Sequence, residues 1–582
     1  MMELSPLAAS NGNFSFAARL IRDLADLGVS HFAISAGSRS APLAASAATT
    51  PGVSISTHID ERSAAFFALG RARFERAPVA LVCTSGTAAA NFAPAVAEAD
   101  RAGVPLILLT ADRPAELRDR GAPQTIDQVR LYGSHARWFH EPPPPTAVET
   151  PAKLARGIAE RTVAEALGRS PGPVHLNLPF REPLAPTGEP APTEDLRALS
   201  ARGTEHSTLS GDGTRTLEAA LETAARPIFV VGPWDPELAS ARALVALARR
   251  VGAPVLAEPL SGLRAGFGSD GLILATADAI LRAPAFAEAM APDLVLRVGA
   301  PPTSKALGRW ISASSAATVF ALDPSVRRQD PDLRVDVWVD ASPDALPAAS
   351  AGSGVRDLGW VPAWQAAEKR AWGAIQAAVL ASKALLPPVA FAALAPALGG
   401  ETTLYLSNSM AVRDAETFLP PLAVSVRMLG NRGANGIDGV LSSALGAAST
   451  GQPVVLATGD LALLHDSGAW WTARRLNLPI TVLAFNDGGG GIFDYLPIAA
   501  EGDRVRFEEV FRVAHGQALA PVAEAFGCAA EVVRDREALC LALSAAEGPT
   551  LLEIRFDPAD NRALHRRVWA DVATALEEGT RS

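Results

Sequence analysis

The chain has few of the residues that mark several classes of protein. Its 582 residues include three cysteines, Cys83, Cys528 and Cys540, an odd number whose spacing fits no metal cluster. A disulfide-stabilised secreted fold is therefore not expected, and the predicted location is the reducing cytoplasm. The N-terminus also lacks the basic segment and apolar core that mark a secretory signal.

Lysine is scarce as well. It occurs four times, so arginine carries nearly all of the positive charge, and the formal net charge is −10. Without basic clusters, nucleic acid is not an expected partner. No run of about 18 apolar residues exists, so no membrane span is predicted. The most apolar stretch, 377–398, is interrupted by Lys383 and by two prolines. Anionic ligands of this protein should be bound by arginines.

Short apolar runs alternate with amphipathic stretches along nearly the whole chain, and 48% of the residues are apolar. This pattern predicts buried parallel strands connected by helices. Two stretches rich in proline, glycine and acidic residues, 183–213 and 343–357, are interpreted as linkers. They predict three α/β domains, each with a doubly wound parallel sheet, over residues 1–185, 215–345 and 380–575. The clearest runs are 79–83, 106–109, 174–178, 228–231, 294–298, 454–457, 480–485 and 551–554.

The most informative stretch is 453–493. One apolar run ends in Gly459-Asp460, and the next ends in Asn486-Asp487 before four glycines. A strand–helix–strand unit makes its two strands parallel, so Asp460 and Asp487 should lie on neighbouring loops at the ligand-binding edge of the sheet. Carboxylate and carbonyl oxygens suit Mg²⁺, and Mn²⁺ accepts the same ligands. The alternative is a parallel sheet with polar strand ends and no metal.

The first domain contains further candidates. Arg39, in the turn after the strand expected at 31–35, could bind a carboxylate through two hydrogen bonds or could simply be exposed. Glu61 precedes a helical segment; it is either an acid that favours the helix N-terminus or a carboxylate that activates a cofactor. Arg113 follows the strand expected at 106–109, again at a strand end.

This stretch resembles the thiamine-diphosphate signature in three parts: Gly459-Asp460, a spacer of nearly thirty residues, and Asn486-Asp487-Gly488. The sequence departs from that signature at two positions. Leu461 replaces the usual second glycine, and Asp487 replaces the usual second asparagine. The second change keeps an oxygen ligand and adds one negative charge near the metal.

Nine segments between about residues 35 and 495 together resemble the 2-succinyl-5-enolpyruvyl-6-hydroxy-3-cyclohexene-1-carboxylate synthase family of menaquinone biosynthesis, in which Leu461 is typical. The resemblance implies three α/β domains of the thiamine-diphosphate decarboxylase type. The first would bind the aminopyrimidine, the third the diphosphate and metal, and the middle one would be largely structural. It also implies a homodimer or homotetramer with active sites between subunits. The segments are SAGSRSAPL, THIDERSAAFFALG, TSGTAAANFAPAVAEA, LILLTADRP, GPVHLNLPF, SNSMAVRD, NRGANGIDG, GDLALLHD and NDGGGGIF.

The implied activity is that of a transferase with thiamine diphosphate as cofactor. It would decarboxylate 2-oxoglutarate and add the succinyl-semialdehyde carbanion to isochorismate, with Glu61 as the catalytic residue. The implied cofactor contacts are Glu61, Ser409, Ile437, Asp460, Asp487 and Ile492. The implied ligands of Mg²⁺ or Mn²⁺ are Asp460, Asp487 and Gly489. The implied substrate contacts are Ser38, Arg39, Arg113, Gln124, Lys305, Arg413, Arg432 and Phe493.

Two further departures bear on carboxylate recognition, because Ala306 and Pro123 occupy positions where arginine and asparagine occur in the family. An alternative function is another thiamine-diphosphate 2-oxoacid carboligase, such as an acetolactate-synthase-like enzyme. The arginines at strand ends argue against its small neutral acceptors. A second alternative is an inactive relative that acts as a binding subunit. The presence of Glu61, Asp460 and Asp487 argues against it.

Overall fold

The computed structural model describes residues 11–145, 152–186, 211–267, 271–346 and 356–581. Most of the two predicted linkers, 187–210 and 347–355, lies outside the described residues. The chain divides into two compact units. Unit 1 consists of Met1–Glu205, Asn431–Gly451 and His465–Leu478. Unit 2 consists of His206–Gly430, Gln452–Leu464 and Pro479–Ser582.

Unit 1 contains a six-stranded parallel sheet in the order β2-β1-β3-β4-β6-β5. Its strands are β1 (His31–Ser35), β2 (Ser54–Thr57), β3 (Val79–Cys83), β4 (Leu106–Asp112), β5 (Trp138–His140) and β6 (Val174–Pro179). The central strands are buried along their whole length, because helices cover both faces.

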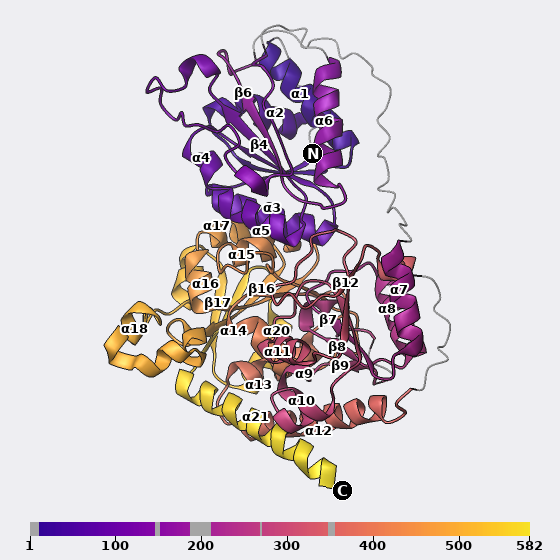
Figure 1. The fold of residues 1–582 in the computed structure, drawn as a ribbon. Coiled ribbons are helices and arrows are strands. Elements are labelled where there is room, and N and C mark those ends of the chain that lie inside the picture. Colours follow the sequence, from indigo (N-terminus) through magenta and orange to yellow (C-terminus); the bar gives the residue numbers. More distant parts are fainter. Residues whose placement is uncertain (1–10, 146–151, 187–210, 268–270, 347–355, 582) are drawn as a thin grey trace. The chain divides into compact units, whose positions relative to one another are not determined.

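Helices α1 and α6 cover one face of this sheet, and α3 and α5 cover the other (Figure 1). The helices are α1 (Gly12–Asp26), α2 (Ala41–Thr49), α3 (Glu61–Glu75), α4 (Thr87–Ala90), α5 (Ala93–Ala102) and α6 (Ala152–Ala166), with α15 (Val440–Ala448) and α17 (Ala469–Leu476) from later in the chain.

Glycines allow α15 to pack directly on the backbone of α3. A Cβ at Gly70 would lie 1.8 Å from the carbonyl oxygen of Ser443, and a Cβ at Gly446 would lie 1.9 Å from that of Phe67. Side chains are therefore excluded at both positions. This close contact explains why residues 431–451 belong to the same compact unit as the first sheet.

Unit 2 contains two six-stranded parallel sheets, in the orders β12-β11-β10-β7-β8-β9 and β14-β13-β15-β16-β18-β17. The strands of the first are β7 (Pro227–Val231), β8 (Val255–Ala257), β9 (Ile273–Leu274), β10 (Leu294–Val298), β11 (Thr318–Leu322) and β12 (Val337–Val339). Those of the second are β13 (Thr403–Leu406), β14 (Arg427–Leu429), β15 (Val454–Gly459), β16 (Ile480–Asn486), β17 (Ala529–Val533) and β18 (Thr550–Arg555).

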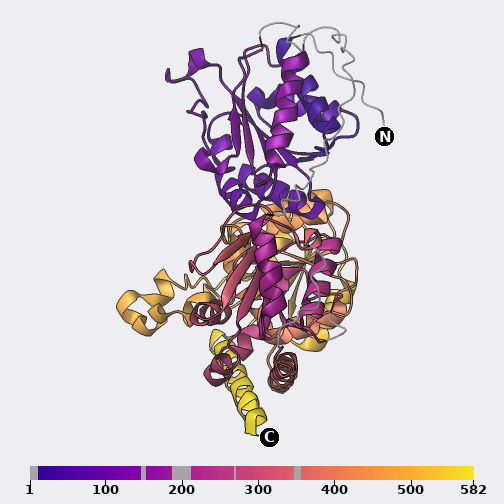
Figure 2. The same cartoon turned by 45° about the vertical axis from the view of Figure 1, so that its right-hand side comes forward.

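One apolar core in unit 2 joins faces of both sheets around Trp360, Trp364 and Phe391. The long helices α12 and α21 pack against each other beside it (Figures 1 and 2). The helices of this unit are α7 (Asp212–Thr223), α8 (Leu238–Val251), α9 (Ala277–Ile280), α10 (Pro284–Ala289), α11 (Lys305–Ala313), α12 (Trp360–Ala381), α13 (Pro387–Leu394), α14 (Met410–Phe418), α16 (Asp460–His465, whose last residue falls in unit 1), α18 (Phe507–Val510), α19 (Ala520–Ala525), α20 (Arg536–Ala545) and α21 (Pro558–Arg581).

The predicted fold class is confirmed: three doubly wound sheets, all parallel in the described residues. Numbered along the chain, the strands of the first and third sheets have the same order, 2-1-3-4-6-5, whereas the middle sheet has the order 3-2-1-4-5-6. All eight apolar runs are strands. The three domain boundaries stay a prediction. No helix in the described part of the chain is long and apolar enough to cross a membrane.

The segment between Asp460 and Ile480 differs from the single helix that its length suggested. It forms two short helices, α16 and α17, separated at Asp466-Ser467-Gly468. The Asp466 carboxylate accepts hydrogen bonds from the main-chain N–H of Ser442 at 2.7 Å and from the Ser63 hydroxyl at 3.2 Å. These contacts hold the residue out of a continuous helix.

Candidate active site

Asp460 and Asp487 come together at the ends of adjacent strands. β15 and β16 pair in parallel, with Gly459 opposite Phe485, so each aspartate follows its strand at the same edge. The main-chain N–H of Gly489 lies 2.9 Å from Asp460 Oδ2 and 3.2 Å from Asp487 Oδ1. Both carboxylates therefore converge on one point of the glycine loop.

The glycine loop has no room for side chains at two of its positions. A Cβ at Gly491 would lie 2.1 Å from Asp487 Oδ2, and one at Gly489 would lie 2.4 Å from the carbonyl oxygen of Arg512. Gly488 has φ +77°, a conformation that side chains disfavour. The loop can therefore fold tightly around the two carboxylates.

The charges of this site fit a divalent cation. Burial raises the pKa of the Asp487 carboxyl to about 7, and the charge of Asp460 adds to the increase. Burial also raises the pKa of Asp460. A bound cation would relieve the repulsion, and carboxylate oxygens are the ligands that Mg²⁺ and Mn²⁺ prefer. Among the described residues, no cluster of three or more His, Cys, Asp or Glu side chains could hold a metal by itself. Carbonyl, phosphate or water oxygens would complete the coordination.

Other predicted residues of unit 2 lie at the ends of neighbouring elements. Ser409 precedes α14 with φ +64°, and its carbonyl accepts a hydrogen bond from Arg413. Burial lowers the pKa of the Arg413 guanidinium, and nearby acids, Asp278 first among them, act in the opposite direction. Lys305 is the exposed first residue of α11. Ile492 and Phe493 lie in the 3₁₀ helix η7 (Gly491–Tyr495), where Phe493 packs on Phe511.

In unit 1, two of the predicted substrate arginines, Arg39 and Arg113, lie at the carboxyl edge of the first sheet. Ser38 and Arg39 follow β1 in the 3₁₀ helix η1 (Ser38–Ser40), and Arg113 follows β4. The Arg113 guanidinium donates to the Ser85 hydroxyl and, at 3.5 Å, to Gln124 Oε1. Burial lowers the pKa of Arg113, and the charge of Arg39 lowers it further. Two guanidinium groups thus form one anion-attracting region.

The same region includes two partners of Arg39 that the sequence did not indicate, Phe180 and Glu182. Arg39 is buried and donates to the carbonyl oxygen of Phe180 at 2.8 Å. Its other terminal nitrogen lies 3.3 Å from Glu182 Oε1. Glu182 follows the sheet's last strand in chain order and lies far from Arg39 in sequence, so no local pattern indicated the pair.

Glu61 is the first residue of α3, but it does not cap the helix. The Asp60 carboxylate accepts the N–H groups of Arg62 at 2.8 Å and of Ser63 at 3.3 Å, which is the N-cap interaction. The charge of Glu61 contributes to the raised pKa of the Cys83 thiol, after burial. Glu61 therefore lies close to the carboxyl end of β3 and is available for another role.

The loop that carries Arg432 and Ile437 is held by a buried acid. Glu98, 2% exposed in α5, accepts the main-chain N–H groups of Gly433 and Ala434 at 2.7 and 2.6 Å. A third N–H, from Asn435, lies at 3.3 Å. Ile437 remains 37% exposed. Glu98 was not predicted; an acid inside the apolar run AVAEA was the only signal in the sequence.

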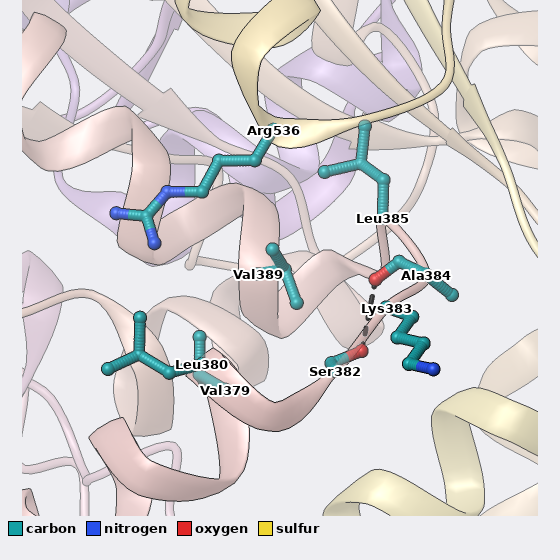
Figure 3. A pocket seen from close by; sticks show the side chains of 8 residues that line it. All are labelled: Val379, Leu380, Ser382, Lys383, Ala384, Leu385, Val389 and Arg536. Atoms are coloured by element: carbon teal, nitrogen blue, oxygen red, sulfur yellow. Dashed lines mark hydrogen bonds between the residues drawn. The ribbon is translucent and has the colours of Figure 1, made fainter.

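A small pocket of unit 2 contains none of the predicted residues. Figure 3 shows its lining, in which the Ser382 hydroxyl donates to the carbonyl oxygen of Ala384 at 3.0 Å. The lining residues are Val379, Leu380, Ser382, Lys383, Ala384, Leu385, Val389 and Arg536. This pocket is therefore separate from the strand-end site.

The fold is that of a thiamine-diphosphate enzyme, and comparison with known proteins agrees. Residues 14–131 match the thiamine pyrophosphate enzyme N-terminal TPP binding domain, and residues 424–554 match the C-terminal TPP binding domain. The chain belongs to the 2-succinyl-5-enolpyruvyl-6-hydroxy-3-cyclohexene-1-carboxylate synthase family.

Three synthases of that name show how closely this chain follows the family. It is 42% identical to the one from Myxococcus xanthus, over 98% of this chain and 99% of the relative. It is 41% identical to that of Chloroflexus aurantiacus, over 96% of each. It is 39% identical to that of Haloarcula marismortui, over 98% of this chain and 100% of the relative.

Proposed function

We propose that this protein decarboxylates 2-oxoglutarate and adds the resulting succinyl-semialdehyde carbanion to isochorismate in a 1,4-addition. The product would be 2-succinyl-5-enolpyruvyl-6-hydroxy-3-cyclohexene-1-carboxylate, a precursor in menaquinone biosynthesis. The observation that carries the proposal is the convergence of Asp460 and Asp487 on Gly489, in a chain whose relatives bear this synthase name. The arginines at the first sheet's edge support a polyanionic substrate pair.

The residues of unit 2 would bind the cofactor's charged end. Asp460, Asp487 and the main chain of Gly489 would hold Mg²⁺ or Mn²⁺, and Ser409 and Ile492 would contact the cofactor. The donor set fits, because it offers oxygens only and brings two largely buried carboxylates close together. Thiamine diphosphate, when bound, supplies an electron sink for decarboxylation.

Glu61 and Ile437 are the predicted cofactor contacts of unit 1. Glu61 would hydrogen-bond the ring nitrogen of the aminopyrimidine and exchange a proton with it, a role left open because Asp60 provides the helix cap. Ile437, partly exposed on the loop held by Glu98, would press against the cofactor.

Eight predicted residues would contact the substrates. Ser38, Arg39, Arg113, Gln124 and Arg432 belong to unit 1, and Lys305, Arg413 and Phe493 belong to unit 2. Guanidinium groups suit this task, because each can form two parallel hydrogen bonds to a carboxylate.

The same proposal extends to assembly and location. The functional form would be a homodimer or homotetramer with active sites between subunits, built from domains at residues 1–185, 215–345 and 380–575. We place it in the cytoplasm, because Cys83, Cys528 and Cys540 form no disulfide.

The test is CO₂ release from 2-oxoglutarate by the purified protein with thiamine diphosphate and Mg²⁺, with and without isochorismate. Strong enhancement by isochorismate, together with an adduct that contains both substrates, is the expected result. Release of CO₂ from pyruvate in preference to 2-oxoglutarate would instead assign the chain to an acetolactate-synthase-like branch.

A further inference from the structure

Arg512 is a buried arginine with several contacts around the glycine loop, and its Nε also lies 3.5 Å from Oε2 of the exposed Glu508 in α18. Arg512 follows α18 and is 4% exposed. One terminal nitrogen donates to the carbonyl oxygen of Asp487 at 2.9 Å and lies 3.6 Å from Asp487 Oδ1. The other terminal nitrogen pairs with Asp494. Its own carbonyl oxygen accepts the N–H of Gly490 at 2.6 Å.

The charges around this loop leave Arg512 as the cation for Asp487. Three largely buried carboxylates lie here: Asp460, Asp487 and Asp494. A fourth acid near Arg512, Glu508, is exposed to solvent. Asp494 already has a second cation, because Arg562 in α21 lies 2.6 Å from its Oδ2. Asp460 and Asp487 repel each other, since both approach Gly489. Among the described residues, Arg512 is the guanidinium that lies within ion-pair distance of the Asp487 side chain.

Asp487 is also the position at which this chain departs from the thiamine-diphosphate signature. Asparagine is usual there, so the aspartate adds one negative charge beside the metal site. An uncompensated extra charge in a buried place is costly. Arg512 therefore explains how the chain can carry an aspartate at this position, and the aspartate explains why an arginine is buried beside it.

We propose that Arg512 is the counter-charge that allows Asp487 to serve as a metal ligand in place of asparagine. The Asp487–Arg512 pair presents the cation with an oxygen ligand while keeping the net charge that a neutral amide would give. This role is a positioning and charge-balancing one, and it rests on the proposed metal site. It makes the two residues interdependent: changing either alone unbalances the site, and changing both restores the balance.

The experiment compares the wild type, Asp487→Asn, Arg512→Gln and the double variant. Mg²⁺ affinity is measured by calorimetric titration at saturating thiamine diphosphate. Asp487→Asn should weaken Mg²⁺ binding roughly tenfold, because the guanidinium charge is left unopposed beside the cation. The double variant should bind Mg²⁺ within about threefold of the wild type. Arg512→Lys, which keeps the charge, should also stay within about threefold.

Thermal unfolding of the metal-free proteins gives a second readout that needs no cofactor. Arg512→Gln should lower the melting temperature, because Asp487 then lacks its cation. The same substitution should cost much less in the Asp487→Asn background. Arg297→Gln is the matched control: Arg297 is also buried and lies 3.1 Å from Asp330, but on β10 of another sheet. It should lower stability and leave Mg²⁺ affinity unchanged.

The inference would be overturned if the effects of the two substitutions simply added, both in Mg²⁺ affinity and in melting temperature. A double variant that binds Mg²⁺ no better than Asp487→Asn would also overturn it. If the wild type binds neither Mg²⁺ nor Mn²⁺, the proposed metal site fails instead. The metal-free unfolding cycle still decides whether Arg512 balances Asp487 in that case.

Discussion

The carboxylate of Glu98 accepts the main-chain N–H of Gly433 at 2.7 Å, although 335 residues separate them in the chain. The acid lies in α5 of the first sheet's helical layer, and the glycine lies in the loop that carries Arg432 and Ile437. Within unit 1, this contact fixes a loop that local sequence alone leaves free, because three N–H groups share one buried acceptor.

Removal of this acceptor should destabilise unit 1 and reduce activity. Glu98→Ala leaves three N–H groups without their partner, which should lower the free energy of unfolding by about 2–4 kcal/mol. The readouts are denaturant unfolding and kcat/KM for both substrates. Glu160→Ala, at an exposed position of α6, is the control and should change neither. Equal behaviour of the two variants would contradict the role given to Glu98.

Glu61→Gln should reduce kcat while leaving the fold intact. The amide cannot take up a proton, and loss of a general acid–base group typically costs about 10²–10⁴-fold in rate. Steady-state kinetics with 2-oxoglutarate and isochorismate measure the effect, and circular dichroism checks the fold. Glu75→Gln, at the other end of α3, is the matched control. Unchanged turnover in Glu61→Gln would refute the catalytic role.

Arg113→Gln should weaken substrate use. A hydrogen bond to a charged group is worth about 1.5–3 kcal/mol, so kcat/KM should fall roughly 10–100-fold, mainly through KM. Arg113→Lys should lose less, because it keeps the charge and loses the planar fork. Arg181→Gln removes a more exposed arginine of the same unit, which pairs with Glu116, and should have little effect. An unchanged KM in Arg113→Gln would remove this residue from the substrate site.

Asp466 should make stability depend on pH. Burial raises the pKa of its carboxyl to about 6 in the folded chain. The folded state therefore binds more protons than the unfolded state between about pH 4 and pH 6, so stability falls as pH rises through this window, by about 3 kcal/mol at most. The asparagine of Asp466→Asn does not titrate, so the variant does not lose stability in this window. The difference in melting temperature, variant minus wild type, should therefore be more positive at pH 8 than at pH 4.5.

Melting temperatures of both proteins across that range test the prediction. Asp119→Asn, at an exposed position of unit 1, should give a curve parallel to that of the wild type. A curve for Asp466→Asn that also parallels the wild type would show that Asp466 is not the source of the pH dependence.

The sequence predicted nine strands, most of them long and buried, and missed the short edge strands as well as the interior strands β8, β11 and β13. Runs such as Val79–Cys83 and Leu294–Val298 are continuous and apolar because helices cover both faces of a parallel sheet. β5, Trp138–His140, has three half-buried residues and no such signal. The break between α16 and α17 was also invisible, because it depends on Ser63 and Ser442, which are distant in sequence.

The sequence by itself determined where the site lies. Residues that directly follow parallel strands must meet at one sheet edge, so the pattern of apolar runs is enough to group Asp460 with Asp487, and Arg39 with Arg113. Only the tertiary structure decided which charges balance one another there. Arg512 beside Asp487, Glu182 beside Arg39 and Glu98 beneath Gly433 are contacts between distant segments, formed because buried charges and N–H groups require partners wherever packing provides them.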